Sequence, residues 1–289
     1  MVSRAMPQSA PLPPGSIAGV RSIIGFPGSP LHGCPRLCEG KVDVWIAPLR
    51  ALGNSLYSMR TLLSPEESKR ASRYRFDVDH RQFVVGRVIL RSLLAMYLNM
   101  DASQISFCYG SFGKPRLAPD LQAANLEFNL SHSEDMLILA VAGGRSVGVD
   151  LEHVRRAPDV MCALDSFLTA AEIRAMRLNP TAEKSRQCLR AWIRKEALVK
   201  ADGRGLHFSL DQLETIHLLP ALSSACSYAH SALVPQSWRL WDLALPGGYL
   251  GTVVAADDGS DLHIRVQAIG HSVGIGLDFT TGPNDSPDR

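Results

Sequence analysis

Asp150 and Glu152 are separated by a single position in segment 147–152, VGVDLE. Side chains alternate between the faces of a β-strand, so both carboxylates would lie on one face, with Cβ atoms roughly 7 Å apart. Two carboxylates this close repel each other unless a cation or a base lies between them. Oxygen ligands suit Mg²⁺, which typically binds one or two carboxylates, phosphate and water. The alternative is a solvated acidic face beside Arg155 and Arg156.

A second pair, Glu196 and Lys200, lies one helical turn apart within segment 185–202, whose apolar periodicity predicts an amphipathic helix. Glu196 follows Trp192 by four residues and Ile193 by three, so it lies at the edge of the apolar stripe. One interpretation is an ordinary ion pair worth a few tenths of a kcal/mol. The other is a third metal-binding acid followed by a cation for phosphate. The residues alone leave both open.

Groups that bind phosphate are present elsewhere in the chain. Lys114 lies in a Gly-Lys-Pro turn, and Ser131 and His132 lie between two predicted strands. They offer an ammonium, a hydroxyl, an imidazole and backbone N–H groups at loops, where binding residues concentrate. The basic cluster from Lys69 to Arg75 either binds a second phosphate or forms the solvated face of a helix.

Hydrophobic patterns predict the elements that position these side chains. Alternating or continuous apolar residues predict strands at 42–46, 105–109, 136–142, 146–152, 238–245 and 249–256. Helices are predicted to start after Ser64 and Thr169, each followed three residues later by a glutamate that completes a capping box, and to cover 79–99 and 185–202. Each half of the chain then contains a strand, helices and strands, which predicts the α+β class.

Changes in composition predict the domain boundaries. Residues 1–38 contain no acid and are rich in proline, glycine and serine, so 1–40 are predicted to be a disordered N-terminal extension. Gly143 and Gly144 interrupt the apolar pattern and divide an N-terminal α+β subdomain, 41–143, from a C-terminal α+β subdomain, 144–275, which carries the metal site. Residues 276–289 are predicted to be a flexible tail.

The composition narrows the class of protein. Thirty basic and 28 acidic side chains in 289 residues give a net charge of +2, which does not favour a nucleic-acid partner. No apolar run approaches the roughly 20 residues of a membrane span, so no membrane partner is expected. Six scattered cysteines indicate reduced thiols and a cytoplasmic protein. His32, Cys34 and Cys38 lack the second ligand pair that a zinc site needs.

Four motifs follow one another along the chain. They are Gly113-Lys114-Pro115, Phe128-Asn129-Leu130-Ser131-His132-Ser133, Gly148-Val149-Asp150-Leu151-Glu152 and Trp192-x-x-Lys195-Glu196-Ala197-x-x-Lys200. Together they resemble the 4'-phosphopantetheinyl transferases, specifically the larger single-chain Sfp type. The resemblance extends from Lys41 to Ala256. Where this family often has a lysine at the start of its first basic helix, this chain has Glu67.

The resemblance implies transfer of the 4'-phosphopantetheine arm from coenzyme A to a serine of an apo acyl or peptidyl carrier protein, with release of adenosine 3',5'-bisphosphate. It implies Mg²⁺ bound by Asp150, Glu152 and Glu196. Glu196 would also be the candidate base for the carrier serine, and Lys200 would stabilise charge on the phosphate. The residues implied for coenzyme A binding are Arg70, Arg73, Lys114, Ser131, His132, Asp150, Lys195 and Lys200.

The resemblance also implies an architecture, namely a monomer of two similar subdomains related by a pseudo-two-fold axis. Coenzyme A would lie between them, and a docking surface for the acidic carrier protein should combine positive charge with an apolar patch. Two alternatives share some of these residues. A Mg²⁺-dependent phosphoesterase or nuclease would use the acids, and a non-catalytic relative would bind coenzyme A alone.

Overall fold

The structure is a computed structural model. It describes residues 21–23, 37, 40–111, 113–177, 181–203, 209–213, 226–228, 237–269 and 277–279. The predictions of a disordered extension over 1–40 and a flexible tail over 276–289 therefore lie mostly outside the described residues. Two short strands are exceptions, β1 (Arg21–Ile23) and β12 (Leu277–Phe279), and both pair with strand β11 (His263–Ile269).

The first half of the chain forms a sheet with helices on one face. Its elements are β2 (Lys41–Pro48), α1 (Leu49–Tyr57), α2 (Pro65–Ala71), α3 (Asp77–Leu98), β3 (Phe107–Tyr109), β4 (Pro115–Leu117), β5 (Leu126–Ser133) and β6 (Met136–Gly143). Strands β3 and β4 form a separate hairpin that carries Lys114 in its turn. Short 3₁₀ helices occur at Arg60–Leu62, Ala102–Gln104 and Pro119–Ala124.

The second half repeats this alternation of strand, helices and strands. Its elements are β7 (Val147–His153), α4 (Ala157–Cys162), α5 (Ala170–Arg177), α6 (Thr181–Asp202), β8 (Cys226–Tyr228), β9 (Trp238–Ala244) and β10 (Tyr249–Ala256). Its 3₁₀ helices include Val154–Arg156, Leu164–Ser166, Leu210–Gln212 and Pro246–Gly248. No helix in the described part of the chain is long and apolar enough to cross a membrane.

The two halves share one topology. In each, three antiparallel strands are ordered first, last, middle: β2-β6-β5 in the first sheet and β7-β10-β9 in the second. A 22-residue helix, α3 or α6, packs on the outer face of each sheet. This repeat confirms the predicted α+β fold of two similar subdomains.

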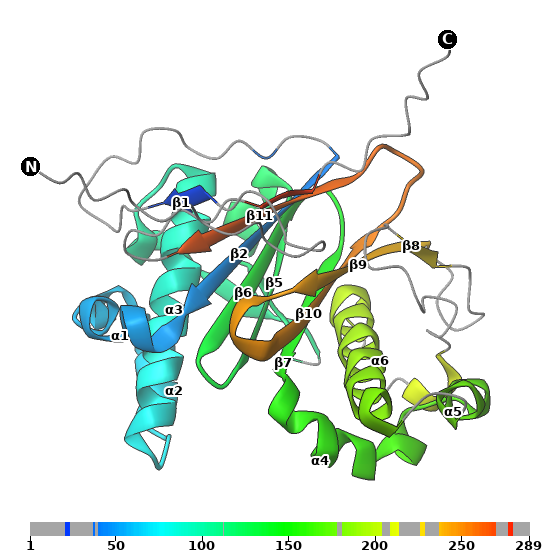
Figure 1. The fold of residues 1–289 in the computed structure, drawn as a ribbon. Helices are drawn as coiled ribbons and strands as arrows, with labels where there is room; N and C mark the ends of the chain where they lie inside the picture. The colour runs from blue at the N-terminus through cyan, green and yellow to red at the C-terminus, as the bar shows by residue number, and fades with distance from the viewer. Residues whose placement is uncertain are drawn as a thin grey trace, which may run out of the picture.

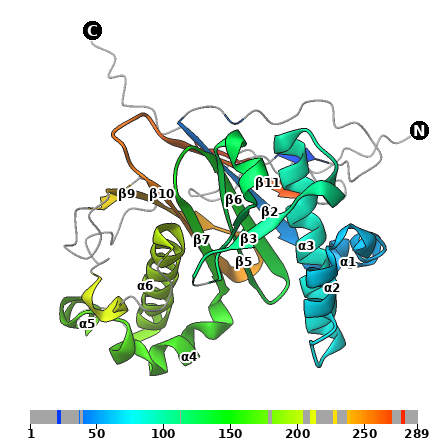
Figure 2. The same cartoon turned by 180° about the vertical axis from the view of Figure 1, so that it is seen from behind.

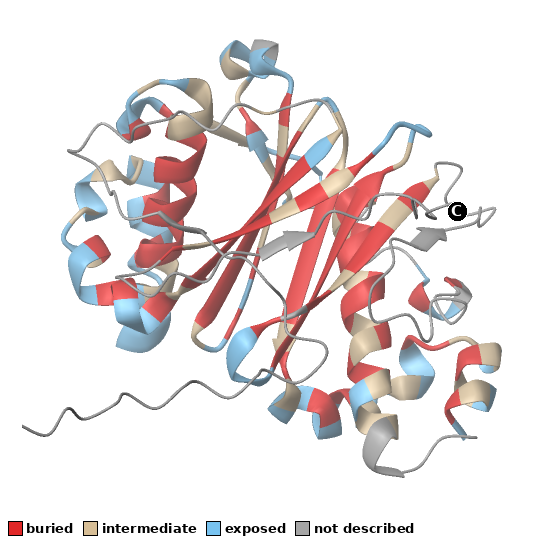
Figure 3. Ribbon diagram, turned by 45° about the horizontal axis from the view of Figure 1, so that its top comes forward, coloured by how far each residue is buried: buried red, intermediate tan, exposed pale blue. Residues whose placement is uncertain are grey.

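The inner faces of the two sheets form one shared hydrophobic core. Alternate residues of β2, β6, β7 and β10 point into it, including Val44, Ile138, Val149 and Val253. Helices α1 and α3 cover the outside of the first sheet, and α6 covers the outside of the second (Figures 1 and 2). Buried residues therefore concentrate on the strands and on the sheet-facing sides of the long helices (Figure 3).

Two helices start at the predicted capping boxes. At α2, the Glu67 backbone N–H donates to Ser64 Oγ at 3.2 Å, and the Ser64 N–H donates to the Glu67 carboxylate at 2.9 Å. The same reciprocal pair joins Thr169 and Glu172 at the start of α5, at 2.9 and 3.1 Å. Both glutamates are also buried, and their carboxylates accept from cations of other elements. The caps thus connect local structure to tertiary packing.

Strand β11 corrects the predicted extent of the second subdomain. Its residues fall within the predicted range 144–275, but β11 pairs in parallel with β2 of the first sheet, from His263 opposite Lys41 to Ala268 opposite Ile46. Without β11, β2 would present an unpaired edge. The chain therefore crosses between the sheets twice, first from β6 to β7 and then from β10 to β11.

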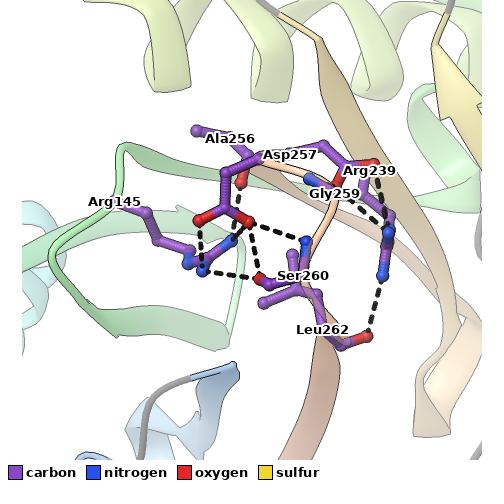
Figure 4. Close-up of polar contacts among 8 residues, drawn as sticks. Arg145, Arg239, Ala256, Asp257, Gly259, Ser260 and Leu262 are labelled. Atoms are coloured by element: carbon purple, nitrogen blue, oxygen red, sulfur yellow. Dashed lines mark hydrogen bonds and ion pairs between the residues drawn. The ribbon is translucent and has the colours of Figure 1, made fainter.

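Arginine side chains hold the second crossing in place (Figure 4). Arg145, in the first crossing, donates to the Ala256 carbonyl at 2.9 Å and pairs with the Asp258 carboxylate at 3.2 Å. Arg239 of β9 pairs with the Asp257 carboxylate at 3.1 Å. Arg145 therefore ties the two crossings to each other.

Candidate active site

Strand β7 presents its alternate residues to two environments, as the sequence predicts. Val147, Val149 and Leu151 lie in the shared core. Asp150 and Glu152 point to the opposite face, on which α6 packs. Asp150 is buried and Glu152 half-buried.

Gly148 allows α6 to approach β7 very closely. A Cβ atom at this glycine would lie 2.1 Å from the Ala197 carbonyl oxygen and 2.3 Å from the Ala201 nitrogen, so a larger residue would displace the helix. Ala197 and Ala201 directly follow Glu196 and Lys200 in the sequence. The close approach therefore brings those two side chains to the acidic face of β7.

Lys200 connects the second sheet to the first. Its ammonium donates to Asp150 Oδ1 at 2.6 Å and to Ser131 Oγ at 3.1 Å. The Ser131 hydroxyl itself donates to Asp150 Oδ1 at 2.8 Å. The structure thus brings these three predicted site residues into one connected group at the line where β5 and β7 meet.

Neighbouring residues of β5 continue this contact with β7. Ser133 Oγ donates to Glu152 Oε2 at 2.6 Å, and the side-chain oxygen of Asn129 accepts from the Val149 N–H at 2.9 Å. Together with Ser131 they are every second residue of β5, so they share one face. Sequence reasoning selected Ser131 and missed the other two, although their period-two spacing was a visible signal.

Glu196 completes the acidic group from the side of α6. Its Oε1 atom is buried and has no hydrogen-bond partner among the described residues. Burial raises the pKa of Glu196, the charge of Asp150 raises it further, and Lys200 opposes the shift. A buried carboxylate oxygen without a donor is costly, and a bound cation would remove that cost.

Glu152 responds to the same surroundings. Burial raises the pKa of Glu152, the hydrogen bond from Ser133 opposes this, and Asp150 raises it again by charge repulsion. However, in the part of the chain that the structure describes, no three Asp, Glu, His or Cys side chains converge as a ready-made metal site. The three predicted metal ligands form a charge-coupled group, in which Lys200 contacts Asp150.

Lys195 corrects a prediction from the resemblance, which places it among the residues that bind coenzyme A. Its side chain is completely buried, and its ammonium donates to the Phe167 carbonyl at 2.6 Å, to Glu172 Oε2 at 2.6 Å and to the Leu210 carbonyl at 2.9 Å. An ammonium has three donors, so all are used. Lys195 fastens α6 to its surroundings and does not face the acidic group.

A second attachment of α6, which sequence reasoning missed, is Asp242 of β9. Its carboxylate accepts from Arg190 Nη1 at 3.0 Å, from Arg194 Nε at 3.1 Å and from Thr252 Oγ1 at 2.9 Å. Burial alone would raise the pKa of Asp242, but the hydrogen bonds and charge of Arg194 and the charge of Arg190 lower it. Thr252 of β10 lies between Asp242 of β9 and Asp150 of β7. This row of neighbouring residues across three strands binds α6 at two places, through Asp242 and through Asp150.

Lys114 reaches the second half from the turn of the β3–β4 hairpin. Its ammonium donates to the Val147 carbonyl at 3.1 Å and to the Ala201 carbonyl at 3.4 Å, at the start of β7 and the end of α6. Burial lowers the pKa of Lys114 to about 8. These two carbonyls are its hydrogen-bond partners among the described residues, so the third N–H can donate to a ligand or to water.

His132 lies at the end of β5, next to the connected group of Lys200, Asp150 and Ser131. The residue is exposed, and partial desolvation of its imidazole lowers the pKa of His132. The positive charge of Lys200 lowers it further. A lowered pKa favours the neutral imidazole at pH 7, which can donate or accept a hydrogen bond at the rim of the site.

Arg70, at the end of α2, and Arg73, just after this helix, are exposed, and the Arg70 guanidinium lies 5.4 Å from the centre of the Phe83 ring. Glu67, on the same helix, is buried and accepts from Arg87 Nε at 2.6 Å and from Arg91 Nε at 2.7 Å. The structure thus explains the acid at this position. Glu67 holds α2 on α3 and does not face a ligand.

Comparison with known proteins places this fold and site in a family. Residues 51–143 match the model "4'-phosphopantetheinyl transferase, N-terminal", and residues 146–254 match "4'-phosphopantetheinyl transferase superfamily". The chain is 36% identical over 215 residues to the 4'-phosphopantetheinyl transferase HetI of Nostoc sp., covering 73% of this chain and 90% of that protein. It is 28% identical over 151 residues to the 4'-phosphopantetheinyl transferase Sfp of Bacillus subtilis, covering 52% and 65% of the two chains.

A mammalian relative shows similar likeness. The L-aminoadipate-semialdehyde dehydrogenase-phosphopantetheinyl transferase of Mus musculus is 31% identical over 167 residues, covering 55% of this chain and 54% of that protein. The fold and the acidic group define a two-lobed transferase of the Sfp type. The chain belongs to the 4'-phosphopantetheinyl transferase superfamily.

Proposed function

We propose that this protein transfers the 4'-phosphopantetheine arm of coenzyme A to a serine hydroxyl of an apo carrier protein and releases adenosine 3',5'-bisphosphate. The observation that carries the proposal is the group of Asp150, Glu152, Glu196 and Lys200 at the junction of the two sheets, within a chain of this superfamily. A diphosphate is cleaved by positioning it and neutralising its oxygens, which is what such a group can do.

The acids fit a hard divalent cation. Glu196 Oε1 has no hydrogen-bond partner among the described residues. Burial, and to a smaller extent the charge of Asp150, raises the pKa of both Glu196 and Glu152, so these carboxylates are desolvated and lie close to like charge. Asp150, Glu152 and Glu196 would hold Mg²⁺, with substrate phosphate and water as further ligands. When bound, the ion would neutralise the diphosphate oxygens.

The remaining side chains act on coenzyme A and on the acceptor. Lys200 would turn its ammonium from Asp150 to the phosphate, where it would stabilise the charge of the leaving group. Ser131, His132 and Lys114 would donate hydrogen bonds to the coenzyme A phosphates, and the exposed Arg70 and Arg73 would provide cations for the 3'-phosphate. Glu196 is the candidate base for the carrier serine, because its pKa is raised toward the neutral pH at which a general base would work.

We further propose a cytoplasmic monomer without nucleic-acid or membrane partners. The sequence supports this by its scattered cysteines, its net charge of +2 and its lack of a long apolar run.

The test is incubation of the protein with coenzyme A, Mg²⁺ and an apo carrier protein, followed by intact-mass measurement of the carrier. We expect a gain equal to one phosphopantetheine group, carried by the serine. Asp150→Asn should lower the rate by about a hundredfold or more, because it removes a charge from the centre of the group. Absence of any gain across acyl and peptidyl carriers would overturn the proposal.

A further inference from the structure

The corner between α2 and α3 is fully solvent-exposed although it is rich in apolar residues. Every residue from Ser72 to Asp79 is exposed. The large apolar residues among them are Tyr74, Phe76 and Val78, with Phe76 61% and Val78 60% exposed. Among the described residues, Tyr109 is the one other large hydrophobic residue that is exposed. Exposed apolar side chains gathered in this way indicate an interaction surface.

The same corner has a surplus of positive charge. Residues 69–79 contain four basic side chains, Lys69, Arg70, Arg73 and Arg75, and two acidic ones, Asp77 and Asp79, which follow the basic run. Glu67, the preceding residue, is buried and neutralised by Arg87 and Arg91. Basic and apolar residues alternate from Arg73 to Phe76, and the Arg75 guanidinium lies 5.5 Å from the centre of the Phe76 ring. The surface therefore combines cations with aromatic rings, a composition enriched at protein interfaces.

The corner lies close to the candidate active site. One turn into α3, Gln82 Nε2 donates to the Glu134 carbonyl at 2.8 Å, in the β5–β6 turn that follows His132. The charge of Asp79, next to Val78, acts on His132 as well. Figure 1 shows α2 and the start of α3 beside this end of β5 and β6. A partner on the corner would therefore lie at the rim of the site.

We propose that this corner, made of Tyr74, Arg75, Phe76 and Val78, docks an acidic helix of the carrier protein so that its serine reaches the site. The proposal rests on the proposed function and names where its protein substrate binds. Charge complementarity selects the partner, because a carrier that is acidic around its modified serine matches a basic corner with apolar contacts at its centre. Steering by charge would act on the rate of association, and the rings would act on the lifetime of the complex.

The experiment compares the KM for the apo carrier with the Kd for coenzyme A. In the double variant Phe76→Ser, Val78→Ser, we expect the carrier KM to rise about tenfold, as expected for loss of an interface anchor. The rate at saturating carrier and the Kd for coenzyme A should stay within about twofold. Arg75→Glu should raise the carrier KM more at low salt than at high salt, because screening weakens charge steering.

Two matched controls define the surface. Tyr109→Ser removes an exposed aromatic ring from the β3–β4 hairpin, and Lys41→Glu reverses an exposed charge at the start of β2. Both should leave the carrier KM unchanged.

Each failure has its own meaning. If the unaltered protein transfers phosphopantetheine but the double variant keeps its carrier KM, the docking surface is wrong and the function stands. If coenzyme A affinity falls while the carrier KM is unchanged, the corner is a nucleotide contact and the docking surface is likewise wrong. If the unaltered chain binds anionic phospholipid vesicles through Phe76 and Val78 with no effect on the carrier, the partner is a membrane surface and the proposal is overturned.

Discussion

Two lysines of α6 show how the surroundings divide residues of one chemistry between structure and function. Lys195 is completely buried, and its ammonium donates all three of its hydrogen bonds to Glu172 and two carbonyls. Lys200, five residues later, is 29% exposed and lies between Asp150 and Ser131. Only the second is placed to meet a substrate, although both belong to one sequence motif.

Exchanging each lysine for methionine should separate these roles. Lys195→Met removes the ammonium that pairs with the buried Glu172 carboxylate, so we expect a loss of about 3–5 kcal/mol in the free energy of unfolding. Lys200→Met should cost much less stability and lower phosphopantetheine transfer by at least about a hundredfold. Urea unfolding followed by circular dichroism and intact-mass assays of the carrier measure the two effects. A stable Lys195→Met protein with weakened coenzyme A binding would restore the ligand role to Lys195.

Lys114 adds a pH dependence to stability. Its pKa is lowered to about 8 in the folded protein, from the ordinary 10.5. Between these values the unfolded chain retains a proton that the folded chain has released, so this residue makes the free energy of unfolding rise with pH in that window. We expect the stability of the unaltered protein, relative to Lys114→Met, to be higher at pH 9.5 than at pH 7.5. The free energy of unfolding of both proteins is measured by urea titration at the two pH values. If it changed equally with pH in both, the lowered pKa of Lys114 would be contradicted.

At the scale of elements, the site depends on how α6 lies on its sheet. Gly148 sets the distance between β7 and α6, and Asp242 of β9 pairs with Arg190 and Arg194 of α6. Lys195 anchors the side of α6 that faces away from the acidic group. Together these contacts leave Glu196 and Lys200 facing Asp150. Three separate attachments are consistent with a site whose geometry must be kept while a substrate enters and leaves.

The substitution Gly148→Ala tests the close approach of α6 to β7. The added carbon would overlap backbone atoms of α6, which cannot move aside as a flexible side chain can. We expect unfolding to become easier by about 1–3 kcal/mol, and transfer to fall by about tenfold or more as Glu196 and Lys200 shift. Gly53→Ala in α1 is the control, because a Cβ there meets nothing within 4 Å. Equal activity in the two variants would show that α6 has room at Gly148.

Elements with long periodic patterns were predictable, and contacts between elements were not. Strand alternation placed Asp150 and Glu152 on one face, and capping signals located the starts of α2 and α5. Nothing local distinguishes Lys195 from Lys200, because which lysine is buried depends on where Phe167 and Leu210 pack. For the same reason β11 was assigned to the wrong half, since its partner β2 lies more than two hundred residues earlier.

At the scale of the whole molecule, the two similar halves form one unit. Their sheets share a core, and β11 returns to the first sheet after the chain has built the second. The two crossings are tied together by Arg145, whose guanidinium donates to the Ala256 carbonyl (Figure 4) and pairs with the Asp258 carboxylate. A ligand that binds between the halves would therefore meet walls that keep one relative position.

This arrangement predicts that the halves unfold together. In a Trp45→Phe, Trp241→Phe variant, the remaining tryptophans, Trp192 and Trp238, report on the second half, because both pack among residues of that half. We expect their fluorescence and the far-ultraviolet circular dichroism of the whole chain to change at one urea concentration, as in a two-state transition. Adding Arg145→Met should shift both signals equally, by about 1–3 kcal/mol, because it removes the donor to the carbonyl of the buried residue Ala256. Arg174→Met, at an exposed position of α5, should shift neither. Two separate transitions would mean that the shared core does not couple the halves.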